Sequence, residues 1–291
     1  MSFKKALRSK DFVLMAELPL TPNSTSDTLL ADASLLRDCV DGFLLTDNQY
    51  GQPHMAPSMA ASILLHNGFD PILQLSCRNR NRIALLGELL GARAIGVETL
   101  MIVRGNVLPE GYSPRPQAVM DIDAKDLMAT AKRINEDELL GASREFLIAT
   151  AATVHNPRPD WHPEELLAKA DAGVHLIITQ LCLDVDVLRR YMEALVSLQL
   201  LRRVSVIVSV AVVPSAELAV WLRENRESAI VPVAMIERLR KAKNPQSEGI
   251  AMCVDLVREI AEIPGVSGIN YAVSADLETV RESIEMLDIA R

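Results

Sequence analysis

The sequence predicts a single (β/α)8 barrel, because short apolar runs alternate with helix-period segments along all 291 residues. The apolar runs are continuous in Val, Ile and Leu, as in parallel strands buried on both faces. Segments between them repeat apolar residues at three- and four-residue spacing, which is typical of amphipathic helices. Eight such units match the size of a TIM barrel. We treat residues 1–291 as one domain, because no Pro-, Gly- or Ser-rich linker divides them.

The eight predicted strands follow one another with helical segments between them. The strands lie at 12–18, 42–46, 71–76, 99–105, 146–152, 174–180, 204–213 and 266–272. The clearest helical segments lie at 26–40, 80–96, 123–137, 162–173 and 184–198. Residues 224–245 predict an extra helix and loop before the last unit. A doubly wound open sheet is the rival architecture, but the chain has no GxGxxG turn after its first strand.

Several helix ends carry their own signals. Ser26 and Asp27 are expected to cap the first helix, and Asp184 the helix after the sixth strand. Three glycines stand where helices are expected to stop, because glycine adopts the left-handed conformation of a helix C-terminus without strain. They are Gly91, Gly96 and Gly173.

Composition excludes several classes of partner and indicates a cytoplasmic protein. The net charge is -8 and no basic stripe is present, which argues against nucleic acid. No uninterrupted apolar run is long enough to span a membrane. The four cysteines are far apart and form no CxxC pair, so they are expected to be reduced core residues. A homo-oligomer is compatible with this composition.

Polar residues at strand ends are the candidate site, because barrel enzymes carry their chemistry at the carboxyl ends of the strands. Glu17 closes the first strand, and a carboxyl there is paired, exposed or raised in pKa. Thr46 and Asp47 follow the second strand, Arg104 and Gly105 the fourth, and Gln180 the sixth. Each also has a plain structural interpretation: a solvated glutamate, a polar turn or a structural ion pair.

Histidines give no metal site. His155 and His162 lie in the loop after the fifth strand, separated by six residues that include two prolines, without the converging carboxylates that a metal site requires. His162 also suits a helix start before Pro163. We therefore predict no metal.

Four segments in the right order resemble the methylenetetrahydrofolate reductase family, a flavin-dependent barrel, over about residues 10 to 288. They are AELPLTP (16–22), the block from LSCRNR to RGN (75–106), DAGVHLIITQLCLD (171–184) and the weaker GIAMCVDLVREI (249–260). The third is the most specific of the four. The resemblance implies binding of tetrahydrofolate derivatives and FAD, with NADH as a compatible electron partner.

The resemblance also implies roles for single residues. Glu17 matches the catalytic glutamate, which protonates N10 of the folate and opens its five-membered ring; hydride from reduced flavin then gives 5-methyltetrahydrofolate. Gln180 matches a folate- and nicotinamide-binding glutamine. Asn106 falls at a position that contacts both flavin and pterin and tunes catalysis. The remaining cofactor contacts fall on Thr46, Asp47, Gln74, Arg104, Gly105, Thr153, His155 and Lys169.

This chain departs from the family pattern at several of these positions. Asn106 replaces an aspartate, Gln74 stands where a histidine often occurs, and Thr153 replaces a tyrosine that packs on the flavin. An arginine expected near Ala275 and Asp276 is absent. Because a neutral Asn106 removes repulsion of an anionic reduced flavin, it favours the oxidative direction of one-carbon catabolism. Two alternatives stay open: a methyl-transfer enzyme without tight flavin, and a folate-binding subunit.

Overall fold

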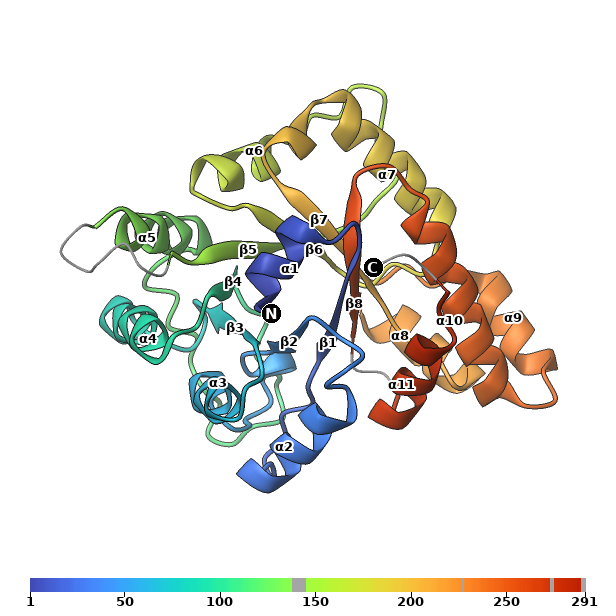
Figure 1. The fold of residues 1–291 in the computed structure, drawn as a ribbon, viewed down its shortest axis with the longest axis horizontal. Coiled ribbons are helices and arrows are strands. Elements are labelled where there is room, and N and C mark those ends of the chain that lie inside the picture. Colours follow the sequence, from blue (N-terminus) through green and yellow to red (C-terminus); the bar gives the residue numbers. More distant parts are fainter. Residues whose placement is uncertain (138–144, 227, 273–274, 289–291) are drawn as a thin grey trace.

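The chain folds as the predicted barrel. The computed structural model describes residues 1–137, 145–226, 228–272 and 275–288. These residues form a closed barrel of eight parallel strands, in which each strand pairs with the next and β8 pairs with β1 (Figure 1). The strands are β1 (Val13–Glu17), β2 (Gly42–Leu45), β3 (Pro71–Ser76), β4 (Thr99–Val103), β5 (Leu147–Ala152), β6 (Leu176–Thr179), β7 (Ser205–Val210) and β8 (Val266–Tyr271).

Most of the helices surround the barrel (Figure 1). Their buried apolar residues form one core with the outward apolar residues of the strands. The extra helix expected within 224–245 is α9, which lies between α8 and α10; residue 227 of that segment lies outside the described residues. The helices are α1 (Phe3–Ser9), α2 (Ser26–Leu35), α3 (Pro57–His66), α4 (Arg82–Ile95), α5 (Ala124–Glu136), α6 (Glu164–Asp171), α7 (Val185–Ser197), α8 (Ala216–Asn225), α9 (Val233–Lys241), α10 (Pro245–Ala261) and α11 (Leu277–Glu285).

Two of the predicted helix signals were wrong. The cap of α2 is Thr25, not Ser26 or Asp27: its hydroxyl accepts from the Thr28 amide, and the Thr28 hydroxyl accepts from the Thr25 amide. Gly91 lies inside α4, because burial of Leu85, Leu89 and Ala92 on the barrel outweighs the roughly 1 kcal/mol that a glycine costs in a helix.

The other signals are confirmed. Asp184 caps α7 by accepting from the amides of Asp186 and Val187. Gly96 ends α4 in the left-handed conformation, and Gly173 follows α6 with a positive φ of 103°. The four cysteines form no disulfides; Cys39 is partly buried, while the other three are buried.

The inside of the barrel is apolar at its lower end, where the strands begin, and polar at its upper end, where the strands end. Side chains alternate along a strand, so Val13, Met15 and Glu17 of β1 share one face. The lower residues of this inner face form a buried cluster with inward residues of the neighbouring strands, including Leu44 and Ile72. The two-residue period then places Glu17 at the top of that cluster, on the side where the strands end.

Helix α1 closes the lower end of the barrel. Figure 1 shows it lying across the ring of strands. Its residues Phe3 and Ala6 are fully buried and belong to the same cluster as the inner strand residues. Gly42 at the start of β2 makes room for it, since an added Cβ would lie 3.1 Å from Phe3 Cβ. The sequence analysis did not predict this helix.

Candidate functional site

A cavity of about 1000 Å³ opens at the carboxyl ends of the strands. The apolar part of its floor is formed by inward residues such as Leu44, Met101 and Ile178. Ligand pockets in proteins span roughly 300 to 1000 Å³, so this one has room for a large ligand. We describe its wall in two parts: the β7–β2 side, contributed by β7, β8, β1, β2 and their loops, and the β3–β6 side.

On the β7–β2 side, the floor carries a small hydrogen-bonded group around Glu17. Glu17 is only 8% exposed, and its Oε1 accepts from Asn270 Nδ2 at 3.5 Å. The same Nδ2 donates to Ser209 Oγ at 3.2 Å. All three residues come from inward positions of β1, β7 and β8, so the barrel itself fixes them. This group holds a carboxyl at the cavity floor.

Asn270 also has an unmet requirement. It is fully buried, lines the cavity, and its Oδ1 has no hydrogen-bond partner within the described ranges. A buried acceptor left unpaired costs roughly 1–3 kcal/mol. A ligand with an N–H or O–H group at this point of the floor would remove that cost.

Above Glu17 on the same side lie Tyr50 and Arg226. Tyr50 belongs to the short turn after β2 and has a positive φ of 54°. The Arg226 guanidinium carbon lies 5.3 Å from the centre of the Tyr50 ring. Burial raises the pKa of the Tyr50 phenol, nearby Arg226 lowers it, and Glu17 raises it. The three groups therefore share one electrostatic environment.

The β3–β6 side carries most of the cavity's cations. Arg104 follows β4, Lys125 begins α5, and Lys169 comes from α6. Lys169 Nζ donates to the Ala151 carbonyl at 3.1 Å and pairs with Glu165 at 2.6 Å. This side is suited to an anionic ligand, since such cations neutralise phosphate groups.

Neutral polar residues complete the β3–β6 side. Gln74, Asn106, Thr153 and Gln180 all line the cavity. His155 lines it as well and packs edge-on against Trp161, with 4.9 Å between ring centres.

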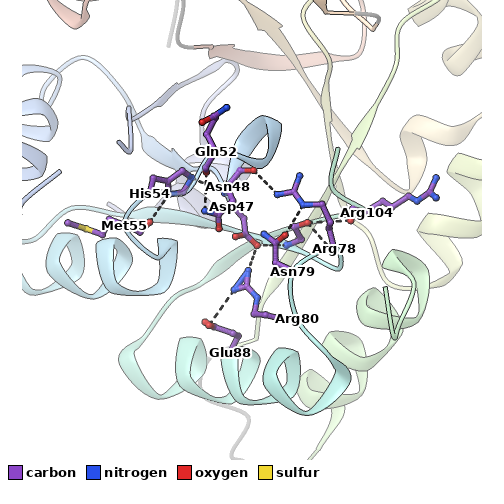
Figure 2. Close-up of polar contacts among 11 residues, drawn as sticks. Asp47, Asn48, Gln52, His54, Met55, Arg78, Asn79, Arg80, Glu88 and Arg104 are labelled. Atoms are coloured by element: carbon purple, nitrogen blue, oxygen red, sulfur yellow. Dashed lines mark hydrogen bonds and ion pairs between the residues drawn. The ribbon is translucent and has the colours of Figure 1, made fainter. Parts of the chain in front are cut away.

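The loop after β4 is packed closely against the end of β3. Gly105 has a φ of +95°, and an added Cβ would lie 2.2 Å from Ser76 Oγ. Fully buried Arg78 donates to the carbonyl of Asn48 at 2.7 Å (Figure 2). It also donates to the carbonyl of Asn106 at 3.0 Å. Arg78 thus joins the loops after β2 and β4 and fixes the backbone on which Asn106 is presented.

A family comparison assigns the chain. The model of methylenetetrahydrofolate reductase matches residues 3–282, nearly the whole length. The chain belongs to the methylenetetrahydrofolate reductase family. No curated protein matches the sequence.

Solved structures share the barrel fold of this chain. A Clostridium thermocellum protein described as binding two copies of 5-methyl-5,6,7,8-tetrahydrofolic acid is similar, with a TM-score of 0.66 at 12% identity, over 97% of this chain and 96% of that one. A 2,3-dimethylmalate lyase of the PEP mutase/isocitrate lyase superfamily has a TM-score of 0.51 at 12% identity, over 97% and 83%. At these identities the likeness concerns the barrel alone.

The cavity brings together most of the residues that the family resemblance predicted. Glu17, Gln74, Arg104, Gly105, Asn106, Thr153, His155, Lys169 and Gln180 all line it. Thr46 and Asp47 do not lie among its lining residues. Asp47 is buried and instead pairs with Arg80 (Figure 2). It also accepts from the Ser76 amide at 2.7 Å. Its contacts join the end of β2 to the end of β3. Asp47 therefore has a structural role in a polar turn, which was the alternative interpretation of its position after the second strand.

The position near Ala275 and Asp276, where the family resemblance predicted an arginine, caps a helix in this structure. Ala275 and Asp276 precede α11, and Asp276 caps that helix by accepting from the Thr279 amide at 2.8 Å. This hydrogen bond lowers the pKa of Asp276. A carboxylate that caps a helix provides no cation for a ligand.

Sequence reasoning missed Asn270, Ser209, Tyr50 and Arg226. Asn270 and Ser209 are single polar residues within apolar strands, and the signal that could have found them is their inward position in the two-residue period. Arg226 follows α8 and is not at a strand end, so a search of strand ends passes over it.

Among the described residues, the cavity holds no reactive thiol and no cluster of metal ligands is formed. Cys77 lines the cavity, but burial raises its pKa to about 11, which keeps the thiol protonated near neutral pH. Across the described ranges, no three His, Cys, Asp or Glu side chains gather to hold a metal ion. No helix in these ranges combines the length and apolarity needed to cross a bilayer.

Proposed function

We propose that the protein interconverts 5,10-methylenetetrahydrofolate and 5-methyltetrahydrofolate, with a flavin as its redox cofactor. The observation that carries the proposal is the Glu17 carboxyl on the cavity floor, held by Asn270, in a chain of the methylenetetrahydrofolate reductase family. In the reductive direction, Glu17 would deliver a proton to N10 of the folate. In the oxidative direction, the same carboxylate would take that proton back.

The residues present fit an FAD. The cavity volume is at the large end of the range for ligand sites, and Arg104, Lys125 and Lys169 would meet the pyrophosphate from the β3–β6 side. Bound there, the flavin would supply hydride exchange with the folate carbon. The protein's part is to orient the two ligands, exclude water at the floor and hold the proton at Glu17.

Gln180 and Asn270 are the groups that would orient the folate ring. Gln180 offers a donor and an acceptor from the end of β6, and Asn270 Oδ1 offers an acceptor from the floor. They would present the ring to Glu17 from two directions. The neutral Asn106, which also lines the cavity, would favour folate oxidation because it removes the repulsion of an anionic reduced flavin.

The test is anaerobic mixing of the FAD-loaded protein with 5-methyltetrahydrofolate. We expect the flavin absorbance of the wild type to bleach as the folate is oxidised. Glu17→Gln should bind both ligands but bleach more slowly than the wild type. Failure of the wild type to bleach, with both ligands bound, would contradict the redox proposal.

A second candidate is a folate-binding barrel without tight flavin, either a methyl-transfer enzyme or a subunit of a complex. It is favoured by Thr153 and Gln74, which replace an aromatic residue and a histidine at the proposed flavin positions. A protein that binds 5-methyltetrahydrofolate but shows no change in FAD fluorescence on titration would support this candidate.

A further inference from the structure

Arg226 is the cation of the β7–β2 side of the cavity. The other lysine and arginine side chains in the described cavity wall, Arg104, Lys125 and Lys169, lie on the β3–β6 side. Arg226 therefore stands apart from the groups that suit a cofactor pyrophosphate, on the side that holds Glu17.

The guanidinium is only partly satisfied by the protein. Its Nε is buried and has no hydrogen-bond partner in the described ranges, and no ion pair to a carboxylate is formed there. Its described aromatic contact is the Tyr50 ring, 5.3 Å away. A buried charged donor without a partner is costly, so this group is poised to accept an anionic ligand.

The position of Arg226 above the cavity floor indicates which anionic group of a ligand could reach it. Glu17 belongs to a strand and lies at the floor, while Tyr50 and Arg226 come from segments beyond the strand ends. A substrate with its reacting ring at Glu17 that extends along this side of the cavity passes Tyr50 and Arg226 on its way to the mouth. For a folate, the part that extends away from the ring ends in the carboxylates of its glutamate tail.

We propose that Arg226 binds a tail carboxylate of the substrate, with the neighbouring aryl group beside Tyr50. This inference rests on the proposed function. The guanidinium fork matches a carboxylate in a bidentate geometry, and the partly buried site strengthens the pairing. Arg226 thereby compensates for the absence of an arginine near Ala275 and Asp276 and makes the site selective for substrates with an acidic tail.

The experiment compares two probes that share a reduced pterin ring. One is 5-methyltetrahydrofolate monoglutamate, and the other is 6-methyltetrahydropterin, which lacks the aryl-glutamate tail. Dissociation constants are measured by calorimetry for the wild type, Arg226→Met and Arg226→Lys. Arg223→Met is the matched control, since Arg223 is an exposed arginine of α8 that does not line the cavity.

We expect Arg226→Met to weaken folate binding by about 10- to 100-fold, as for loss of a charged hydrogen-bonding partner, and to leave pterin binding unchanged. Arg226→Lys should retain part of the folate affinity, and Arg223→Met all of it. Equal weakening for both probes, or no weakening for either, would overturn the assignment.

Two further arms separate the remaining outcomes. FAD titration of Arg226→Met should match the wild type, and a loss confined to FAD would reassign Arg226 to the cofactor pyrophosphate and overturn the inference. Wild-type protein that binds neither pterin probe would instead refute the proposed function itself, and the inference with it.

Discussion

The two sides of the cavity differ in how their polar groups are held. On the β7–β2 side, Glu17, Asn270 and Ser209 are strand residues that hydrogen-bond to one another across neighbouring strands. On the β3–β6 side, Arg104 and Lys125 are exposed side chains on loops and helix starts. Glu17, Asn270 and Ser209 are therefore organised before any ligand arrives, whereas the exposed Arg104 and Lys125 would be ordered by the ligand itself. Lys169 is the exception on the β3–β6 side, because the Ala151 carbonyl and Glu165 already hold it.

This difference matches the two tasks that the proposed reaction requires. Proton transfer depends on the position of one carboxyl to within a fraction of an ångström, so rigid strands are the suitable support. Binding an extended anionic cofactor depends on several contacts, each of which tolerates adjustment. The comparison teaches that one barrel can place its precise chemistry on strands and its adaptable binding on loops.

The largest expected effect tests the organised side. Glu17→Gln keeps the shape and hydrogen-bonding capacity of the side chain but cannot deliver a proton. We expect turnover to fall by about 100-fold or more while folate still binds. Steady-state kinetics with parallel folate titration would measure both. Near wild-type turnover would remove Glu17 as the acid and erase the functional contrast between the two sides.

The next effect tests which side chain binds the folate ring. Gln180→Ala removes an amide at the end of β6, and the folate group that it pairs with would lose roughly 1–3 kcal/mol of interaction. Folate affinity should therefore drop more than FAD affinity. Titrations of the variant with each ligand decide this, and a loss for FAD alone would assign Gln180 to the cofactor.

A smaller effect is expected at Asn106, whose backbone is fixed by Arg78. Asn106→Asp would place a negative charge beside a flavin bound as proposed and would disfavour its anionic reduced form. The potential of bound FAD should fall by tens of millivolts, where ~30 mV corresponds to about 1.4 kcal/mol for two electrons. A redox titration against a reference dye measures it, and an unchanged or higher potential would refute the charge argument.

The smallest effect lies at the closed end of the barrel, away from both sides. Burial raises the pKa of Asp70 to about 6, opposed by the Phe3 amide and reinforced by Glu98. A raised folded-state pKa means that the folded protein binds this proton more tightly than the unfolded chain. Asp70 therefore contributes stability at low pH, which is lost as the pH rises through about 6.

Asp70→Asn should remove that dependence. Between pH 7 and pH 5, we expect the wild type to gain about 1 kcal/mol of unfolding free energy relative to the variant. Urea denaturation at the two pH values measures the difference, and folate affinity serves as the control. Equal pH dependence in both proteins would show that Asp70 does not titrate in this range.

The barrel could be predicted from the sequence because buried parallel strands leave a clear apolar signal, strand after strand. Helix α1 could not, since seven residues of mixed character have no periodicity to read and are helical only because Phe3 and Ala6 enter the barrel. Glycine signals were ambiguous because tertiary packing also decides where a helix ends. Gly96 ends α4, whereas Gly91 lies inside that helix, which packing on the barrel stabilises.

The site was predictable where a polar residue ends an apolar strand, as at Glu17 and Gln180. Asp47 satisfied the same rule but pairs with Arg80, a partner 33 positions away that the pattern does not reveal. Arg226 breaks the rule, because the chain returns it to the cavity from beyond α8. Local pattern therefore locates the cavity, and tertiary contacts decide which residues face it.

The helix that closes the lower end of the barrel has a kinetic consequence. With Phe3 and Ala6 filling that end, ligands exchange through the mouth at the strand ends. If two ligands occupy the cavity together, the deeper one must arrive first and leave last, so release is compulsorily ordered. If they alternate at one place beside the cofactor, reciprocal plots at several fixed concentrations of the second substrate become parallel lines.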